Sequence, residues 1–531
     1  MQPIRILIAV ITVVFFTAGC KKTLEEHPYD FYSSENMFNT AADAEAAATG
    51  MYGELHTWNM FKSPYWSDID FDNDHVSGPG WLMGTEGVAN YSSAWTVPNL
   101  WLGFYTLNYQ ATTILDKVPA IQMDSIVRGR ILGEAYFFRA WAFFHLVRLW
   151  GDVPLRLNRL TGAGSADMAR APVKDIYAQI ISDLQQAESL LLARKDPRSG
   201  PAGKVTRGAA QTLLAKVYLT MASASLPGAG ISVRGGTDNN DYTWTKNVVK
   251  GYEGMDSKSL FIKARDKAKQ VMDSGEYKLF SSWAEVWSMG NKNGQEHIWS
   301  LQATNDNTFG TLFEQYYSAP SFGGYGYLWI TNFHYDEYES TDERVQTGVY
   351  HRWMQNGAWM YYPERDSLKY KYGADSSVAR YMKTPFLTKY WTGNMAPNES
   401  IGYRGCNFPL LRYADVLLIY AEAENEVNGP TSNAYNAINQ VRSRSKATPV
   451  PPGLTQQAFR SFVFAERGRE FTQEANRKFD LLRWGIYVQV MSKLGVVDNN
   501  SKIRSDKQLL MPIPDAELNA NKLINGNNPG W

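Results

Sequence analysis

Three stretches of this chain alternate small and large side chains at helical period, and each is followed by a second helical stretch. The first members cover 134–151, 208–222 and 414–429, and the second members cover 173–192, 262–274 and 432–445. Ala140, Ala215 and Ala421 in the first members would let helix backbones approach closely. Such pairs bury their faces only by stacking on one another, as in tetratricopeptide-like arrays. We therefore predict a mainly α-helical scaffold of degenerate helix pairs, interrupted by long excursions.

Helical period is strongest over 131–150, where apolar side chains line two opposite faces. Ile131 and Phe138 belong to one face, and Tyr136 and Trp150 belong to the other. A helix that is apolar on two sides is covered on both by other elements. We therefore place 131–150 inside the scaffold, with further helices expected over 41–55 and 100–118.

Two long excursions interrupt the helical pattern, at 223–260 and 281–412. The second mixes turn residues with short strand-like runs such as 297–301. Loops of this size are usually either functional or disordered. The chain contains 17 Trp, 31 Tyr and 24 Phe, and an aromatic-rich loop is not typical of disorder. The excursions are therefore expected to carry function.

The N-terminus has the pattern of a lipoprotein signal. An apolar run over 6–16 ends in Thr17-Ala18-Gly19-Cys20, and it is too short to span a bilayer but has the length of a signal-peptide core. Small residues directly before a cysteine resemble a bacterial lipobox, although Thr17 stands where Leu is usual. We predict a signal peptide over 1–19, lipidation of Cys20 by more than one acyl chain, and a tether over 20–40. Cys406 is then left without an intramolecular disulfide partner.

Charge balance excludes one class of partner. The 53 Lys+Arg equal the 53 Asp+Glu, and the net charge is +0. A protein without a basic excess has no overall electrostatic attraction to nucleic acid. We therefore expect no nucleic acid partner.

Long motifs occur in a fixed order from the first third of the chain to its end. They are RILGEAYFFRAWAFFHLVRLWGDVPL (130–155), VTRGAAQTLLAKVYL (205–219), PLLRYADVLLIYAEAENE (409–426), AINQVRSRS (437–445), ERGREF (466–471), RKFDLLRWG (477–485) and MPIPDAELNANKLINGNNPGW (511–531). Together with the lipobox, they closely resemble the SusD/RagB family of outer-membrane nutrient-uptake lipoproteins.

The resemblance implies both a fold and a role. The fold is four tetratricopeptide-like helix pairs in a right-handed superhelical scaffold with a few short strands. The implied role is non-catalytic and needs no cofactor. A cell-surface lipoprotein of this family captures oligosaccharides and covers a SusC-like TonB-dependent transporter as a lid. Some relatives bind peptides instead. Residues 41–531 would then form a single SusD-like domain, with scaffold segments 41–57, 99–222, 261–280 and 412–495 and ligand-side loops 58–98 and 281–411.

Charged residues near the C-terminus could be interpreted as a catalytic site, because a glycoside hydrolase needs paired carboxylates. At helical spacing they form ion pairs between stacked helices instead, and the motif offers no pocket for a general acid. The sequence also contains no G-x-S-x-G, H-E-x-x-H, Walker A or G-x-G-x-x-G motif. We therefore predict no catalytic residues and a structural role for these side chains: Glu466, Arg467, Arg469, Glu470, Glu474, Arg477, Asp480 and Arg483.

Metal binding is not predicted either. The seven histidines show no ligand spacing. Asp70-x-Asp72-x-Asp74 begins like a calcium loop, but His75 and Trp81 stand where an EF-hand needs Gly and Glu. Acidic clusters in loops commonly form turns, and an irregular calcium site there stays open as an alternative.

A sugar site needs flat aromatic rings with amide or carboxylate groups beside them, because sugars have apolar C–H faces and polar edges. Two loop regions, 70–95 and 305–329, supply both, and glycines between the rings of the second predict that they project from a mobile backbone. Packing under the loops stays open as an alternative for any one ring. The predicted ligand-binding residues are Asp72, Asn73, Trp81, Trp95, Asn307, Tyr325, Tyr327 and Trp329.

The other aromatic residues fall into two groups. Trp353, Trp359, Tyr361 and Tyr362 form a third candidate cluster, while Trp101, Tyr105, Trp283, Trp287 and Trp299 are expected in the core. We therefore predict an outer-membrane, lipid-anchored glycan-binding protein that works beside a transporter. Three alternatives stay open: a peptide-binding member of the same family, a surface glycoside hydrolase, and a helical scaffold without a small ligand.

Overall fold

The computed structural model describes residues 37–80, 89–92, 94–159, 166–235, 240–320, 324–355, 358–362, 379–381, 384–392, 402–497 and 500–531. The predicted signal peptide, Cys20 and Trp81 lie outside these residues. Also outside are the side chains of Trp353, Trp359 and Tyr361, whereas Tyr362 is buried.

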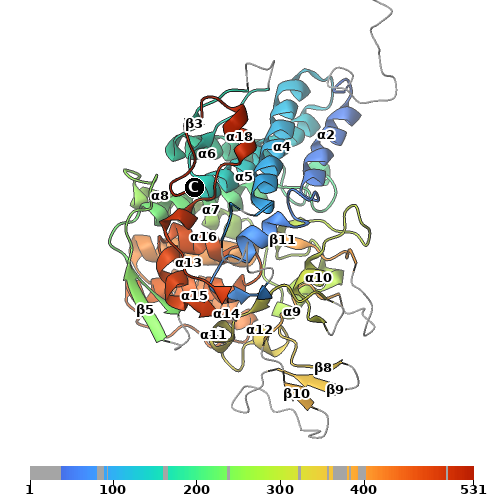
Figure 1. Cartoon of the computed structure of the whole chain (residues 1–531). Coiled ribbons are helices and arrows are strands. Elements are labelled where there is room, and N and C mark those ends of the chain that lie inside the picture. Colours follow the sequence, from blue (N-terminus) through green and yellow to red (C-terminus); the bar gives the residue numbers. More distant parts are fainter. Residues whose placement is uncertain are drawn as a thin grey trace, which may run out of the picture.

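Long helices form the scaffold (Figure 1). They are α2 (Ala41–Glu54), α4 (Thr96–Lys117), α5 (Ser125–Trp150), α6 (Val173–Leu190), α7 (Arg207–Ser225), α8 (Ser257–Asp273), α13 (Tyr413–Asn428), α14 (Ser432–Arg444), α15 (Gln456–Glu470), α16 (Arg477–Arg483) and α17 (Tyr487–Leu494). Helix α5 packs on α6, α7 on α8 and α13 on α14, which confirms the three predicted pairs. Because α6 also packs on α7 and α8 on α13, the pairs form one continuous stack. None of the described helices combines the length and the apolar composition that crossing a membrane requires.

The core is centred on α5, which is covered on both faces as predicted. Phe138 and Trp150 are fully buried on opposite faces, and the Trp299 ring packs edge-to-face against Phe138 at a centroid distance of 5.7 Å. Trp101, Trp283 and Trp299 are buried, as expected for core residues, while Tyr105 and Trp287 are partly buried. Trp299 belongs to the second excursion, so this excursion is anchored directly in the scaffold core.

Short elements make up the excursions. In the first, β4 (Gly230–Gly235) and β5 (Asn240–Thr245) form an antiparallel pair that packs on α15 and α17. In the second, β6 (His297–Leu301) occupies the predicted strand and pairs antiparallel with β11 (Phe408–Arg412). The other short elements there are α9 (Trp283–Trp287), α10 (Phe313–Tyr317), β7 (Trp329–Ile330), α11 (Asn332–Asp336), α12 (Glu343–Gln346), β8 (Arg352–Gln355), β9 (Ala358–Tyr361) and β10 (Ala379–Tyr381).

The remaining short elements flank the scaffold. A π-helical turn, η2 (Trp66–Asp70), leads into β1 (Val76–Ser77), which pairs with β7. Strands β2 (Val153–Pro154) and β3 (Arg170–Ala171) form a second small pair, and β12 (Val496–Val497) and β13 (Asn500–Ser501) form a third. Helix α18 (Asp515–Ala520) lies in the C-terminal segment.

The charged C-terminal motif is buried and paired, which confirms the structural interpretation. Arg467 donates to Asp415 of α13 at 2.8 Å, and Arg442 of α14 donates to Glu466 at 2.6 Å. Burial alone would raise the pKa of the Glu466 carboxyl, but the guanidiniums of Arg344, Arg469 and Arg442 hold it well below its usual range. These carboxylates are therefore charged at neutral pH and enclosed by cations.

The same carboxylates bind cations of the second excursion, and we call this set the buried ion-pair network. Arg344 reaches Glu466 at 2.7 Å and Glu470 at 3.1 Å. Arg412 reaches Glu470 at 2.9 Å, and Lys389 reaches Glu474 at 2.6 Å. Removing one partner of a buried pair costs about 3–5 kcal/mol because the other charge is left uncompensated. The network therefore fixes the excursion on the C-terminal helices.

Candidate ligand-binding surface

Four aromatic side chains from two distant parts of the chain form one cluster, the aromatic platform: Trp66, Tyr316, Tyr325 and Tyr327. Tyr316 and Tyr327 are stacked, with ring centroids 5.4 Å apart and planes 11° apart. Tyr325 lies 5.1 Å from Tyr327, and Trp66 lies 4.5 Å from Tyr316. Trp66 and Tyr316 are buried, Tyr327 is half-buried, and Tyr325 is 47% exposed. The platform therefore has a fixed base and an open edge.

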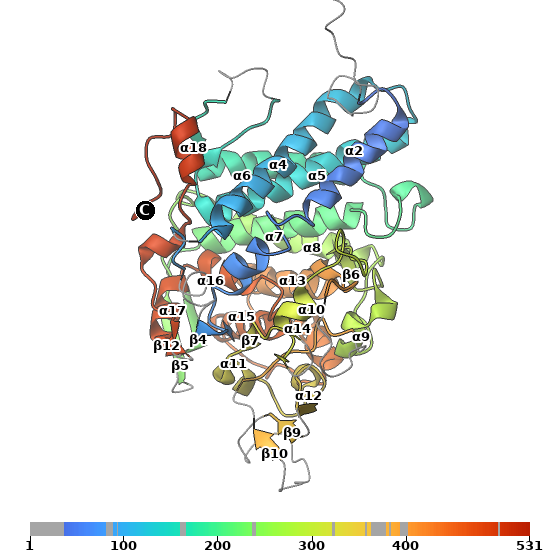
Figure 2. The same cartoon turned by 45° about the vertical axis from the view of Figure 1, so that its right-hand side comes forward.

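Figure 2 marks α10, the short helix that carries Tyr316. The sequence around Tyr325 folds back on this helix. The backbone N–H groups of Tyr325 and Tyr327 donate to the carbonyl oxygens of Gln315 and Tyr316 at 2.6 and 2.7 Å. Gly326 adopts φ of +60°, a conformation that favours glycine, and a Cβ there would lie 2.8 Å from Pro320 Cδ. Hydrogen bonds thus hold residues 325–327 against α10, and the mobility expected of this loop remains a prediction.

Lys62 joins the platform to the loop that carries Asn307. Its Nζ donates to the Asn307 carbonyl oxygen at 3.0 Å and lies 5.3 Å from the centroid of the Tyr403 ring. The Lys62 carbonyl oxygen accepts hydrogen bonds from Trp66 Nε1 at 3.4 Å and from the Tyr316 hydroxyl at 3.3 Å. Lys62 thus sets an ammonium group at the edge of the platform, with the exposed Asn307 beside it.

A second exposed ring extends this surface. Phe309 is exposed and packs edge-to-face on His56 at 5.4 Å. Burial, and then the nearby charge of Lys62, lower the pKa of His56 to about 4. The His56 ring is therefore neutral at physiological pH. Exposed aromatic rings beside an amide and an ammonium group suit the apolar faces and hydroxyl groups of a sugar.

The platform brings together only part of the predicted site. Tyr325, Tyr327 and Asn307 lie on this surface. Trp329 packs instead against Phe386, at 5.9 Å, beside a separate apolar cluster that includes Ile330. Trp95 is 54% exposed, at the start of α4. Trp81 lies outside the described residues.

Asp72 and Asn73 are not surface groups, and this corrects their assignment to the ligand site. Asp72 is fully buried and pairs with Arg504 at 2.9 Å and Lys478 at 3.1 Å. The Asn73 side chain donates to the Asp70 carbonyl oxygen at 2.7 Å and accepts from the His75 N–H at 2.8 Å. Both residues therefore belong to the scaffold, where Asp72 neutralises buried cations and Asn73 closes a turn.

The same burial bears on the calcium alternative. Asp74 pairs with Arg477 at 2.6 Å, and the Asp70 carboxyl accepts hydrogen bonds from the Ala475 N–H and the Tyr317 hydroxyl, both at 3.0 Å. The oxygens that a calcium ion would need are thus directed at protein groups.

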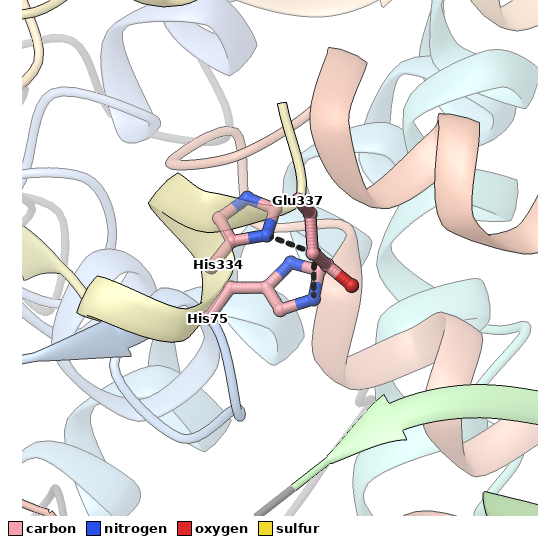
Figure 3. Close-up of side chains that lie close together, drawn as sticks. All are labelled: His75, His334 and Glu337. Atoms are coloured by element: carbon pink, nitrogen blue, oxygen red, sulfur yellow. Dashed lines mark hydrogen bonds and ion pairs between the residues drawn. The ribbon is translucent and has the colours of Figure 1, made fainter. Parts of the chain in front are cut away.

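One group of side chains among the described residues has the composition of a metal site: His75, His334 and Glu337 (Figure 3). Glu337 lies 2.5 Å from His334 Nδ1 and 3.8 Å from His75 Nε2. The two imidazole rings are stacked, with centroids 3.6 Å apart and planes 10° apart. The lone pair of an imidazole nitrogen lies in the plane of its ring. The lone pairs of two parallel, stacked rings therefore do not converge on one ion at a bonding distance of about 2.0–2.1 Å. We interpret this group as a stacked, hydrogen-bonded part of the scaffold.

Sequence reasoning missed Lys62, Trp66, Tyr316, Phe309 and Tyr403. Trp66 and Tyr316 form the buried base of the platform, and burial beneath a loop leaves no periodic signal. Lys62 and Tyr403 meet across more than half of the chain. The one available signal was the recurrence of aromatic residues in the loops after α2 and after β6.

Comparisons with known proteins agree along the whole chain. A family model described as "SusD family" matches residues 240–531, and one described as "Starch-binding associating with outer membrane" matches residues 23–219. SusD-like protein P25 of Formosa agariphila is 26% identical to this chain over 98% of both chains. A SusD-like protein of Bacteroides ovatus is 22% identical and aligns over 91% of this chain and 83% of its own length.

Solved structures share the fold. A SusD homolog from Bacteroides thetaiotaomicron superposes with a TM-score of 0.75 at 22% identity, covering 94% of this chain and 98% of its own. A laminarin-binding SusD-like protein superposes with a TM-score of 0.68 at 20% identity, covering 93% of this chain and 100% of its own. These likenesses confirm the predicted helical fold.

Proposed function

The chain belongs to the SusD family, and from this premise we propose that it binds oligosaccharides at the cell surface and delivers them, uncleaved, to a SusC-like TonB-dependent transporter. The observation that carries the proposal is the aromatic platform. Its rings are held in place before any ligand arrives, since the loop of Tyr325 is hydrogen-bonded to α10. A preformed binding surface loses little conformational entropy when the ligand binds.

Two features support a glycan ligand. Relatives in the comparison include a laminarin-binding protein, and the N-terminal family model is described as starch-binding. The platform itself offers ring faces next to Lys62 and Asn307, which can bond sugar hydroxyl groups. A peptide ligand is the alternative within the family.

The state of three glutamates supports the non-catalytic part of the proposal. Glu466, Glu470 and Glu474 are buried in ion pairs and cannot reach a ligand on the platform. A general acid of a glycosidase must instead lie at the scissile bond.

Calorimetry with a panel of laminarin and starch oligosaccharides, uronic acid oligomers and short peptides tests the ligand class. We expect an oligosaccharide to bind with Kd between about 1 μM and 1 mM, or about −8 to −4 kcal/mol, and to be recovered intact. Peptide binding alone would favour the alternative within the family, and release of shortened sugars would favour a hydrolase.

Lipid anchorage at Cys20 has its own test. The Cys20→Ala variant should move from the membrane fraction to the soluble fraction, because the acyl chains supply the anchorage. Unchanged membrane retention of the variant would refute the anchor without bearing on glycan binding.

A further inference from the structure

Helix α4 carries an exposed apolar stripe along its outward face, the α4 stripe: Trp95, Pro98, Leu102, Tyr105 and Tyr109. Trp95 is 54% exposed, Leu102 53% and Tyr109 47%. Pro98 is exposed and Tyr105 is half-buried. Trp95 already has helical dihedral angles, so it continues the helix by one residue. Spacings of three and four residues repeat along the stripe, which is the pattern of a seam that packs against another element.

The stripe is free of charge along its length. No Asp, Glu, Lys or Arg occurs between Thr96 and Leu115. Charge returns only at the end of the helix, where Asp116 pairs with Arg159 at 3.3 Å. Solvent-facing helices usually carry charged residues on the outer face, so a neutral, aromatic stripe is unusual for a face that stays in water. Its composition matches the core of a protein interface, which is depleted in charge and enriched in Tyr and Trp.

The neighbouring helix α2 has two positions with open space around them. It packs against α4, and a Cβ added at Gly50 or Gly53 would meet no atom within 4 Å.

We propose that the α4 stripe is the surface on which the TonB-dependent transporter docks. This inference rests on the proposed function, because that function supplies the partner. The described chain begins at Met37, directly before α2. The 17 residues from the lipidated Cys20 to Met37 span at most about 60 Å. The described helix nearest to the anchor in sequence is therefore α2, which packs against α4.

The absence of charge on the α4 stripe favours a protein partner over a lipid surface. Anionic head groups attract Lys and Arg, and the stripe offers none. The transporter of the proposed function is a protein in the same membrane as the lipid anchor. A second copy of this chain is the competing occupant, because the stripe has Leu102 at its centre and an aromatic ring at either end.

Leu102→Glu tests the proposal, and Leu523→Glu is the matched control. Leu523 has the same residue type and the same exposed fraction, 53%, but lies outside α4. Each tagged full-length protein is produced in its own host, extracted with mild detergent and captured, and the barrel is identified by mass spectrometry. We expect Leu102→Glu to recover at least about tenfold less barrel than the wild type, because it buries an unpaired carboxylate at the centre of the interface. The control should recover as much as the wild type.

Four outcomes would overturn the inference. Equal recovery with Leu102→Glu refutes the docking face but leaves the partner in place. Equal loss with both variants refutes the assignment to α4. If the wild type recovers no barrel although the membranes contain it, both the partner and the docking face are refuted. If the purified wild type is a dimer in solution that Leu102→Glu dissociates, a second copy occupies the stripe instead. Glycan affinity, measured on the same variants, should stay unchanged.

Discussion

Replacing Tyr325 with alanine is the most direct test of the aromatic platform, because the ring is half exposed and its contacts are known. A covered tyrosine side chain buries about 150–250 Å², so its 47% exposed part leaves about 70–120 Å² for a ligand to cover. At about 25 cal/mol per Å², full coverage contributes about 2–3 kcal/mol to binding. A sugar that covers one ring face gains about half of that, so Tyr325→Ala should weaken Kd by about 5- to 10-fold.

The stability of the Tyr325→Ala variant should change much less. The truncation removes ring contacts with Tyr327 and Tyr316, at 5.1 and 6.3 Å, and an aromatic pair contributes about 0.5–1.5 kcal/mol. The loop remains fixed by its backbone hydrogen bonds, which alanine retains. The free energy of unfolding should therefore fall by about 1 kcal/mol.

Tyr109 provides the matched control, because it is the same residue type with the same exposed fraction, 47%, on α4. Affinity is measured by calorimetry with the tightest oligosaccharide of the panel, and stability by urea denaturation. Tyr109→Ala should bind that oligosaccharide like the wild type. If Tyr325→Ala binds as tightly as the wild type, or if both variants lose affinity equally, the platform is not the binding site.

Three further predictions concern the scaffold and the loop that carries Tyr325. Trp150→Ala should lower the free energy of unfolding by about 3–5 kcal/mol, since it leaves a cavity in the core, and urea denaturation measures this loss. Burial raises the pKa of the Asp70 carboxyl to about 7, above its value of about 3.9 in the unfolded chain. The protonated carboxyl therefore stabilises the folded chain fully below pH of about 4, and this stabilisation is lost as pH rises to about 7. The free energy of unfolding of Asp70→Asn should therefore rise relative to that of the wild type between pH of about 4 and about 7. If denaturation at a series of pH values finds a constant difference between the two proteins, the raised pKa of Asp70 is contradicted. Gly326→Ala places a residue with a Cβ in the left-handed conformation, at a cost of about 1–2 kcal/mol. Calorimetry should therefore find weaker glycan binding by this variant. Unchanged affinity would mean that the loop tolerates the change.

Helical segments could be predicted because their signal is local. The expected helix over 173–192 is α6, Val173–Leu190, and the expected strand over 297–301 is β6. The partner of β6 could not be found the same way, since β11 lies more than 100 residues further along the chain. Long-range pairing leaves no periodic trace in a single sequence.

The proposed binding surface was only partly predictable for the same reason. Flanking glycines identified Tyr325 and Tyr327, but the role of Asp72 depended on Arg504 and Lys478, which come from the other end of the chain. A polar residue in a loop is equally consistent with a ligand contact and with a buried ion pair. Only the folded chain distinguishes the two.

The buried ion-pair network has a consequence for how new ligand preferences could evolve on this fold. Arg344 and Arg412 fasten the excursion to Glu466 and Glu470, and none of the four takes part in the platform. Replacing Tyr325 should therefore cost the fold only about 1 kcal/mol, whereas removing one charge of the network should cost about 3–5 kcal/mol. Selection can then act on the rings alone. Proteins with this scaffold could thus acquire new ligand preferences while they keep the same set of buried charges.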